Sequence, residues 1–321
     1  MTENEKKSNT AEQRDPVVRG IEKVLSFLPK DLSADQQEKV AEIRTLLDQI
    51  EGKREIAKAS SEDPRAAEPI EKGEVDLLLF GGQSNMQGET EGFPEDNEPV
   101  AGALEYRLLT KSLIPLMHPV GEDIPPEALL GAHKGYGSMA PYFCRSYVEA
   151  TGHSVIAVHV SKGSTTVLQW QKGAHPRYDV MVEKIRGAID AARAAGYRIG
   201  HIYFMWLQGE SDALKHTAED EYLRLLTALK NDLKADVGIE KFCIIRVGYF
   251  SKAHEYDEAI MRAQERAAAD DADFVMLTRI CATLSMDPAY LNPNVAGHYS
   301  NFGLRRIGET AGRALGMLIS Q

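Results

Sequence analysis

Five short apolar runs, separated by longer amphipathic stretches, constrain the fold of this 321-residue chain more than any other feature. The runs are residues 75–80, 154–160, 201–207, 242–247 and 274–277. Stretches with helical spacing of apolar residues lie between and after them, at residues 140–151, 178–195, 218–234, 256–269 and 302–319. Near-continuous apolar strands, each followed by a helix, are typical of a parallel sheet covered on both faces. We therefore expect an α/β fold, a three-layer α/β/α sandwich with a five-stranded parallel sheet.

The first 74 residues differ from the rest in charge density. They hold 30 charged side chains, about 41%, and Phe27 as their one aromatic residue, whereas the other 247 residues hold 55 charged side chains, about 22%. Such a segment buries too little apolar surface to offset its ordering entropy. We expect a charged helical extension and linker over residues 1–74 and one globular domain over residues 75–321.

Within the extension, residues 16–28 and 33–50 have helical spacing, and Ser33 with Gln36 fits a capping box. Residues 51–74 lose this spacing and gather prolines and a glycine, as linkers do. We expect a helical hairpin that packs on the domain or joins two copies of the chain as a homo-oligomer. A solvated, partly disordered tail is the alternative.

The composition excludes several classes of partner. The net charge of −11 offers no basic field for nucleic acid. No run approaches the roughly 20 apolar residues that span a bilayer, and the first 15 residues lack the apolar core of a signal peptide. We expect no nucleic-acid or membrane partner and a cytoplasmic chain as given.

Neither cysteines nor histidines indicate a metal centre. Three cysteines lie far apart in apolar stretches, which predicts buried thiols rather than disulfides or a thiolate site: Cys144, Cys243 and Cys281. Four histidines lack ligand spacing: His153, His159, His175 and His201. We expect neither a metal nor a cofactor.

The residues after each apolar run matter most, because ligands of parallel α/β sheets bind beyond the carboxyl ends of the strands. The first run is followed by the sequence GGQSNMQG, where the glycines allow a sharp turn and Ser84 would open the next helix. Free backbone N–H groups at such a turn stabilise a developing anion, which suits a nucleophile. A simple N-cap, a phosphate cradle and an ordinary turn are the alternatives for this loop.

Later strand ends carry further polar residues. The second run is followed by KGST, whose Gly163 allows close approach of its N–H to a ligand; a plain turn glycine is the alternative. The third is followed by QGESD, with Gln208, Glu210 and Asp212, which are costly to bury unless they are paired or used. His298 lies in a loop before the last helix, where a structural or exposed histidine is the commoner case.

Taken together, GGQSNMQG, KGSTTVLQW, WLQGESDA and GHYSNFGLRRIG resemble, in this order, the sequence blocks of the SGNH (GDSL-like) hydrolase superfamily. The match is best with its sialate O-acetylesterase and acetylxylan esterase branch, carbohydrate esterase family six. The resemblance covers residues 75–321 and implies a flavodoxin-like fold. It implies that Ser84 is the nucleophile, that Gly163 and Gln208 join the Ser84 N–H in the oxyanion hole, and that His298 is the general base.

One position departs from the family's pattern. The aspartate usually found three residues before the histidine is Val295 here. That carboxylate orients the imidazole and stabilises its charged form. Glu210 is our first candidate for the replacement, and three residues of the same late segment are further ones: Asp287, Asn292 and Asn294.

The resemblance therefore predicts a cofactor-free serine esterase that removes O-acetyl or other small acyl groups from a carbohydrate such as sialic acid or a polysaccharide. A non-catalytic or weakly active binder of acetylated glycans is the alternative, because Val295 replaces the carboxylate. A nucleotide-binding regulator that uses residues 81–88 is a third hypothesis, and it lacks the partners of a phosphate site. Sialic acid would call for a cation at its carboxylate, for which Lys162, Arg177 and Arg246 are candidates.

Overall fold

We describe the chain from a computed structural model. It describes residues 70–124, 129–131 and 136–320, together with seven isolated positions before residue 70. The chain divides into two compact units, Met1–Ala66 and Ala67–Gln321, and the sheet with its covering helices belongs to the second. The helices and linker predicted for residues 1–74 lie almost entirely outside the described residues. The domain boundary at residue 74 and the role of the extension therefore stay predictions.

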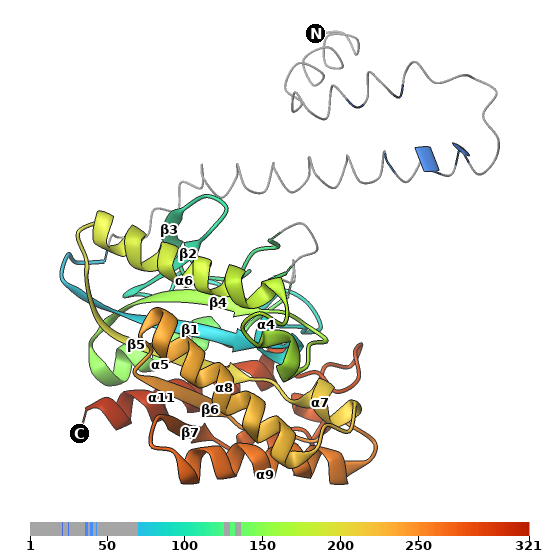
Figure 1. Cartoon of the computed structure of the whole chain (residues 1–321). Coiled ribbons are helices and arrows are strands. Elements are labelled where there is room, and N and C mark those ends of the chain that lie inside the picture. The colour runs from blue at the N-terminus through green and yellow to red at the C-terminus, as the bar shows by residue number, and fades with distance from the viewer. Residues whose placement is uncertain are drawn as a thin grey trace. The chain divides into compact units, whose positions relative to one another are not determined.

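A seven-stranded sheet forms the middle layer of this unit (Figure 1). Its strands are β1 (Glu74–Gly82), β2 (Ala103–Arg107), β3 (Ser112–Pro115), β4 (Ser154–Ser161), β5 (Arg198–Leu207), β6 (Lys241–Ile245) and β7 (Phe274–Thr278). The order is β3-β2-β4-β1-β5-β6-β7, and every neighbouring pair is parallel except β2 with β3. The α/β prediction is confirmed and all five predicted runs are strands. The prediction of a five-stranded parallel sheet is wrong, because a hairpin of β2 and β3 extends one edge and makes the sheet mixed.

Buried charges explain why this hairpin does not read as strands in the sequence. Glu105 in β2 is fully buried, its carboxylate accepts the Gly121 N–H at 2.8 Å, and it pairs with Arg107 at 3.0 Å. Glu122 accepts the N–H groups after β2 and pairs with the fully buried Lys184 at 2.8 Å. These charged side chains, which in the sequence suit a surface loop, are therefore paired in the interior, both with each other and with groups further along the chain.

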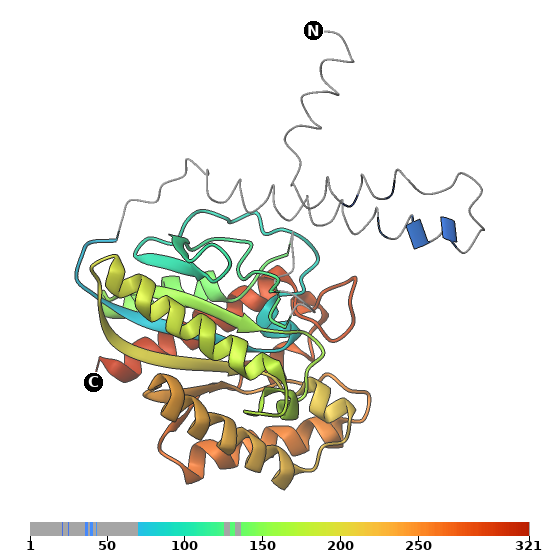
Figure 2. The same ribbon diagram turned by 45° about the horizontal axis from the view of Figure 1, so that its top comes forward.

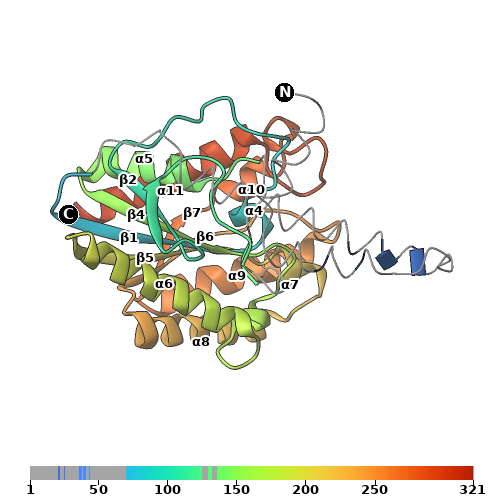
Figure 3. The ribbon, with the colours of Figure 1, turned by 90° about the horizontal axis from the view of Figure 1, so that it is seen from above.

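Helices cover both faces of the sheet, as expected. Figure 3 shows α5 (Ala140–Thr151) and α11 (Asn301–Ile319) on one face, with α6 (Pro176–Ala194) and α8 (Glu219–Val237) on the other. Next to α8 lies α9 (His254–Asp270), and the two run side by side (Figure 2). Shorter elements are α4 (Ser84–Gln87), η1 (Val167–Trp170), α7 (Glu210–Leu214), α10 (Ile280–Leu284) and η2 (Pro288–Tyr290).

The place of β1 in the sheet determines where the candidate site lies. Eight of the nine residues of β1 are buried, and β1 lies between β4 and β5. The chain returns to the sheet on one side of β1 as β4 and on the other as β5, so the carboxyl end of β1 is a topological switch point. The residues after β1, β4 and β5 meet there.

The expectations for the cysteines and for membrane-spanning helices are compared with the described residues alone. Cys144, Cys243 and Cys281 are free thiols and are all buried, as predicted. Within residues 70–124, 129–131 and 136–320, none of the helices is both long and apolar enough to cross a membrane.

Candidate active site

Ser84 follows a tight turn at the end of β1. Gly82 has φ +146°, and a methyl group added there would collide with the Leu207 carbonyl at the end of β5. The Gly82 carbonyl accepts the Lys162 N–H at 3.0 Å, and the Gln83 N–H donates to the Leu207 carbonyl at 3.1 Å. Glycine is needed here because both the left-handed φ and the close backbone exclude a side chain. The turn thus ties the serine to both neighbouring strands.

Ser84 and His298 form a hydrogen bond. Ser84 Oγ lies 2.8 Å from His298 Nε2, although 214 residues separate them in the chain. Ser84 is 4% exposed and His298 8%. This is the nucleophile-to-base distance that activates a serine.

The loop that carries His298 is held from three sides. The His298 carbonyl accepts the Asn292 N–H at 2.8 Å, which closes the loop on itself. Asn85, next to the serine, accepts the Tyr299 N–H at 3.3 Å and donates to the Gly297 carbonyl at 3.4 Å. The Phe250 ring packs edge-on against the imidazole with centroids 5.6 Å apart. Asn292, one candidate for replacing the family's aspartate, therefore positions the loop and does not reach the imidazole. Asp287, another candidate, caps η2.

The other imidazole nitrogen faces a backbone carbonyl. His298 Nδ1 lies 3.0 Å from the Ala296 carbonyl oxygen, which can only accept a hydrogen bond. We therefore assign the proton to Nδ1, which leaves the Nε2 lone pair for the Ser84 hydroxyl. The Ala296 carbonyl stands at the nitrogen that the family's aspartate would face, and it fixes the tautomer without supplying a full negative charge.

Glu210 contacts the site through another residue. Its Oε1 accepts a hydrogen bond from Asn85 Nδ2 at 2.7 Å, and its Oε2 is buried without a hydrogen-bond partner among the described residues. Burial raises the pKa of the Glu210 carboxyl, and the Asn85 hydrogen bond opposes this rise. The expected direct contact with His298 is absent from the hydrogen bonds of the described residues. Glu210 orients Asn85, which in turn holds the histidine loop.

A second carboxylate, which the sequence analysis missed, lies beside the histidine. Glu89 Oε2 is 3.3 Å from His298 Nε2, and the Glu89 side chain is 27% exposed. Its backbone carbonyl accepts a hydrogen bond from Asn292 Nδ2 at 2.8 Å, which joins the segment after Ser84 to the histidine loop. In the sequence, the signal for this role is that Glu89 is an acidic residue directly after GGQSNMQG.

Gly163 lies against the serine, as expected of an oxyanion donor. A methyl group added at Gly163 would be 3.5 Å from Ser84 Cβ. The Gly163 N–H donates to Gln87 Oε1 at 2.6 Å. Among the described residues, no backbone carbonyl in a turn, loop or cap accepts the backbone N–H of Ser84. Two backbone donors therefore meet at the nucleophile, and one of them has a side-chain partner that the sequence analysis missed.

The side-chain amide of Gln208 is engaged by other residues of the fold, among them Gln83 at 3.3 Å. It is fully buried, and its amide nitrogen donates to the Thr165 carbonyl at 2.8 Å and to Asp212 Oδ2 at 2.6 Å. Asp212 also accepts the Val167 N–H at 2.9 Å, so the two side chains fix the loop that follows β4. Both amide hydrogens of Gln208 are committed to these acceptors. The geometry gives no support to an oxyanion donor at this position.

Three further side chains have partners within the fold. Trp170, the last residue of the block KGSTTVLQW, is fully buried and packs edge-on against Trp206, so it belongs to the core. Arg177 donates to the Leu129 carbonyl at 2.8 Å, and Arg246 pairs with Glu265 at 2.7 Å. Both candidate arginines therefore have partners within the fold, which gives no support to a role in binding a substrate carboxylate.

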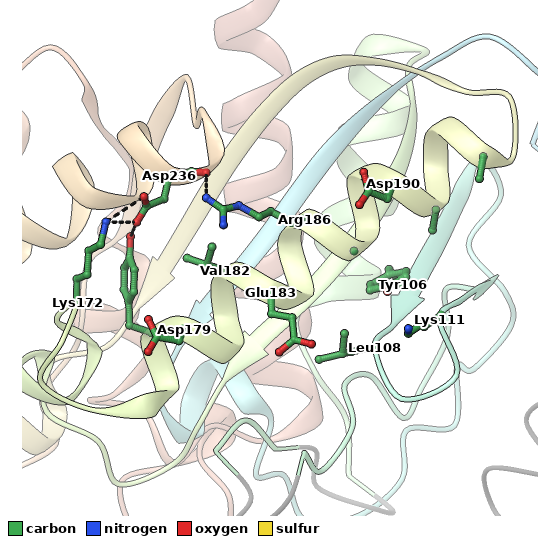
Figure 4. A pocket seen from close by; sticks show the side chains of 14 residues that line it. Tyr106, Leu108, Lys111, Lys172, Asp179, Val182, Glu183, Arg186, Asp190 and Asp236 are labelled. Carbon is green, nitrogen blue, oxygen red and sulfur yellow. Dashed lines mark hydrogen bonds and ion pairs between the residues drawn. The ribbon is translucent and has the colours of Figure 1, made fainter.

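No group of three or more potential metal ligands occurs among the described residues. A hollow of about 800 Å³ lies along α6 and the β2–β3 hairpin, lined by residues such as Tyr106, Glu183 and Arg186 (Figure 4). At one end Asp236 accepts hydrogen bonds from Lys172 and Tyr178. None of the lining residues belongs to the Ser84 site, so we do not assign the chemistry to this hollow.

The geometry agrees with a family match. A family model described as carbohydrate esterase, sialic acid-specific acetylesterase, matches residues 74–303. The chain belongs to this carbohydrate esterase family. The predicted resemblance and the prediction of a carboxylic ester hydrolase acting on O-acetyl esters are confirmed at this level.

Solved structures similar to this carbohydrate esterase are distant in sequence. A protein from Arabidopsis thaliana has the same fold, with 18% identity and a TM-score of 0.58, and the match covers 74% of this chain and 96% of that one. A carbohydrate acetylesterase from Xanthomonas citri is 17% identical with a TM-score of 0.46, over 75% of this chain and 56% of that one. No curated protein sequence matches the chain.

Proposed function

We propose that this protein hydrolyses O-acetyl esters of a carbohydrate through an acyl-enzyme on Ser84, with His298 as the general base. The observation that carries the proposal is the 2.8 Å hydrogen bond from Ser84 Oγ to His298 Nε2, with the Nδ1 proton directed to the Ala296 carbonyl. A serine activated in this way attacks an ester carbonyl. The low exposure of Ser84 favours a small acyl group such as acetyl.

The reaction has two halves. Ser84 Oγ bonds to the carbonyl carbon while its proton passes to His298 Nε2, and the carbonyl oxygen becomes an oxyanion beside the Ser84 and Gly163 N–H groups. The carbon–oxygen bond to the sugar then breaks, and the sugar oxygen leaves with the proton from Nε2. Water repeats the sequence on the acyl-enzyme, releasing acetate and restoring the serine.

Glu89 supplies the negative charge that Val295 does not. A carboxylate 3.3 Å from Nε2 is unfavourable beside a neutral nitrogen lone pair and favourable beside an imidazolium. The imidazolium exists only after the proton has left Ser84, so Glu89 acts in the transition state more than in the ground state. Because Glu210 is held by Asn85, we give it a positioning role.

One pair of observations favours the alternative, a binder of acetylated glycans with little activity. His298 Nδ1 faces a carbonyl rather than a carboxylate, and the Gly163 N–H already donates to Gln87. A single experiment separates the two functions. The purified full chain is assayed with p-nitrophenyl acetate and with an acetylated polysaccharide, alongside S84A and, as a matched control, S146A, whose serine is buried on α5.

We expect the wild type and S146A to turn over p-nitrophenyl acetate and S84A to lose at least about 1,000-fold in kcat. Turnover retained by S84A would remove Ser84 from the mechanism. A wild type that binds the polysaccharide without turnover would favour the binder.

A further inference from the structure

The Gln87 side chain accepts a hydrogen bond from Gly163, the residue whose N–H is directed at the substrate oxyanion in the proposed function. Its Oε1 accepts the Gly163 N–H at 2.6 Å. A methyl group added at Gly163 would lie 3.1 Å from this oxygen and 3.5 Å from Ser84 Cβ, so the amide oxygen, the donor and the nucleophile are neighbours. The resting site therefore has one of its two backbone donors already satisfied.

The orientation of the Gln87 amide follows from the partners of its two ends. A backbone N–H can only donate, so the oxygen rather than the nitrogen of the amide faces Gly163. The nitrogen end lies against Gly131, where an added methyl group would come within 2.5 Å of Nε2. At the backbone, the Gln87 N–H donates to the Gln83 carbonyl at 2.8 Å in the turn of α4. Gln87 is 4% exposed, so the side chain is packed in place.

We propose that Gln87 caps the oxyanion hole, so that the acyl carbonyl must displace its side-chain oxygen before Gly163 can stabilise the transition state. The inference rests on the proposed function. The Gln87 amide oxygen and the acyl oxygen of the substrate compete for the same Gly163 N–H and repel one another there. The acyl oxygen is a stronger acceptor than the amide oxygen only once it has become the negatively charged oxyanion. Gln87 is therefore a positioning residue, and it lowers the net contribution of the Gly163 N–H to catalysis.

Isosteric substitution tests the cap. Gln87→Met keeps the volume, removes the acceptor and keeps water out of the vacated place. We expect kcat/KM for p-nitrophenyl acetate to rise about tenfold, the size of one net hydrogen bond. Gln87→Glu replaces the neutral acceptor by a carboxylate at the same place and should lower kcat/KM at least tenfold.

A second readout distinguishes this role from a packing role. The phosphoryl oxygen of a fluorophosphonate enters the same hole, so its rate of inactivation should rise in Q87M and fall in Q87E. Q171M is the matched control, because Gln171 is also buried and donates to the carbonyls of Val167 and Leu225. Thermal unfolding checks that each variant is folded, and Gln87→Ala replaces Q87M should that variant fail to fold.

Opposite changes in Q87M and Q87E, in both turnover and inactivation, support the cap. Unchanged or lower rates in folded Q87M, or in Q87A in its place, overturn it. The two proposals fail separately, because activity lost in S84A without a gain in Q87M refutes only the cap, whereas activity retained in S84A refutes the proposed function.

Discussion

Removing the negative charge of Glu89 should slow ester hydrolysis, because this charge stabilises the His298 imidazolium that forms during the reaction. Glu89→Gln keeps the size of the side chain and removes the charge 3.3 Å from His298 Nε2. Two unit charges at this separation interact by about 5 kcal/mol at an effective dielectric of about 20 and by about 1 kcal/mol in bulk water. The Glu89 side chain is 27% exposed and that of His298 11%, so the value lies between these limits. We expect kcat to fall about 10- to 100-fold, or about 1.4 to 2.7 kcal/mol.

The assay is steady-state hydrolysis of p-nitrophenyl acetate. KM should change little, because the imidazolium forms after substrate binding. Glu91→Gln is the matched control: it removes the same charge two residues away, and Glu91 accepts the Asn301 N–H at 2.9 Å. A folded E89Q with kcat within twofold of wild type, next to an inactive S84A, would refute the reasoning.

Three further variants test positioning and stability. Glu210→Gln should keep kcat within about fivefold, because an amide oxygen still accepts from Asn85; a 100-fold loss in the same assay would make Glu210 the orienting carboxylate instead. Burial lowers the pKa of His118 from 6.5 to about 4, so the unfolded chain binds a proton in this interval that the folded chain does not, and stability falls as pH drops through it, by about 3 kcal/mol at most. Urea unfolding of His118→Asn at pH 7.5 and pH 4.5 should show a smaller loss than wild type, and an equal loss would assign the effect to other groups. Lys184→Met leaves the Glu122 carboxylate buried without its partner and should cost about 3 to 5 kcal/mol in urea unfolding, whereas a cost under 1 kcal/mol would show that the carboxylate finds other compensation.

Parallel strands were predictable from the sequence because they are buried on both faces and read as apolar runs. The β2–β3 hairpin was not, because the charged groups of Glu105 and Arg107 depend in part on backbone groups of Pro119 and Gly121, which the fold brings to them. A single sequence does not show that the charge of Lys184, far along the chain, lies beside this hairpin. The sheet was therefore predicted from β4 to β7 and missed at the edge formed by β2 and β3.

The candidate site was likewise predicted only in part. Ser84 and Gly163 come together because they follow β1 and β4, whose carboxyl ends share one edge of the sheet. His298 reaches Ser84 from the loop between η2 and α11. The orientations of Gln208 and Glu210 depend on hydrogen bonds to Asp212 and Asn85, which a strand-end position does not reveal.

The spacing between Ser84 and Gln87 in the sequence indicates that their side chains are close. Gln87 lies three residues after Ser84 in a helical turn, a spacing that brings side chains to the same face. Glu89 follows the turn directly, and its approach to His298 requires a loop about 200 residues further along the chain.

Covalent labelling tests the central claim most directly. The full chain is treated with a fluorophosphonate, digested, and the modified peptide identified by mass spectrometry in the wild type, in His298→Ala and in S146A. The Ser84–His298 hydrogen bond predicts one label, on Ser84, in the wild type and S146A, and a rate at least about 100-fold lower in His298→Ala. Labelling at another serine, or an unchanged rate in a folded His298→Ala, would contradict it.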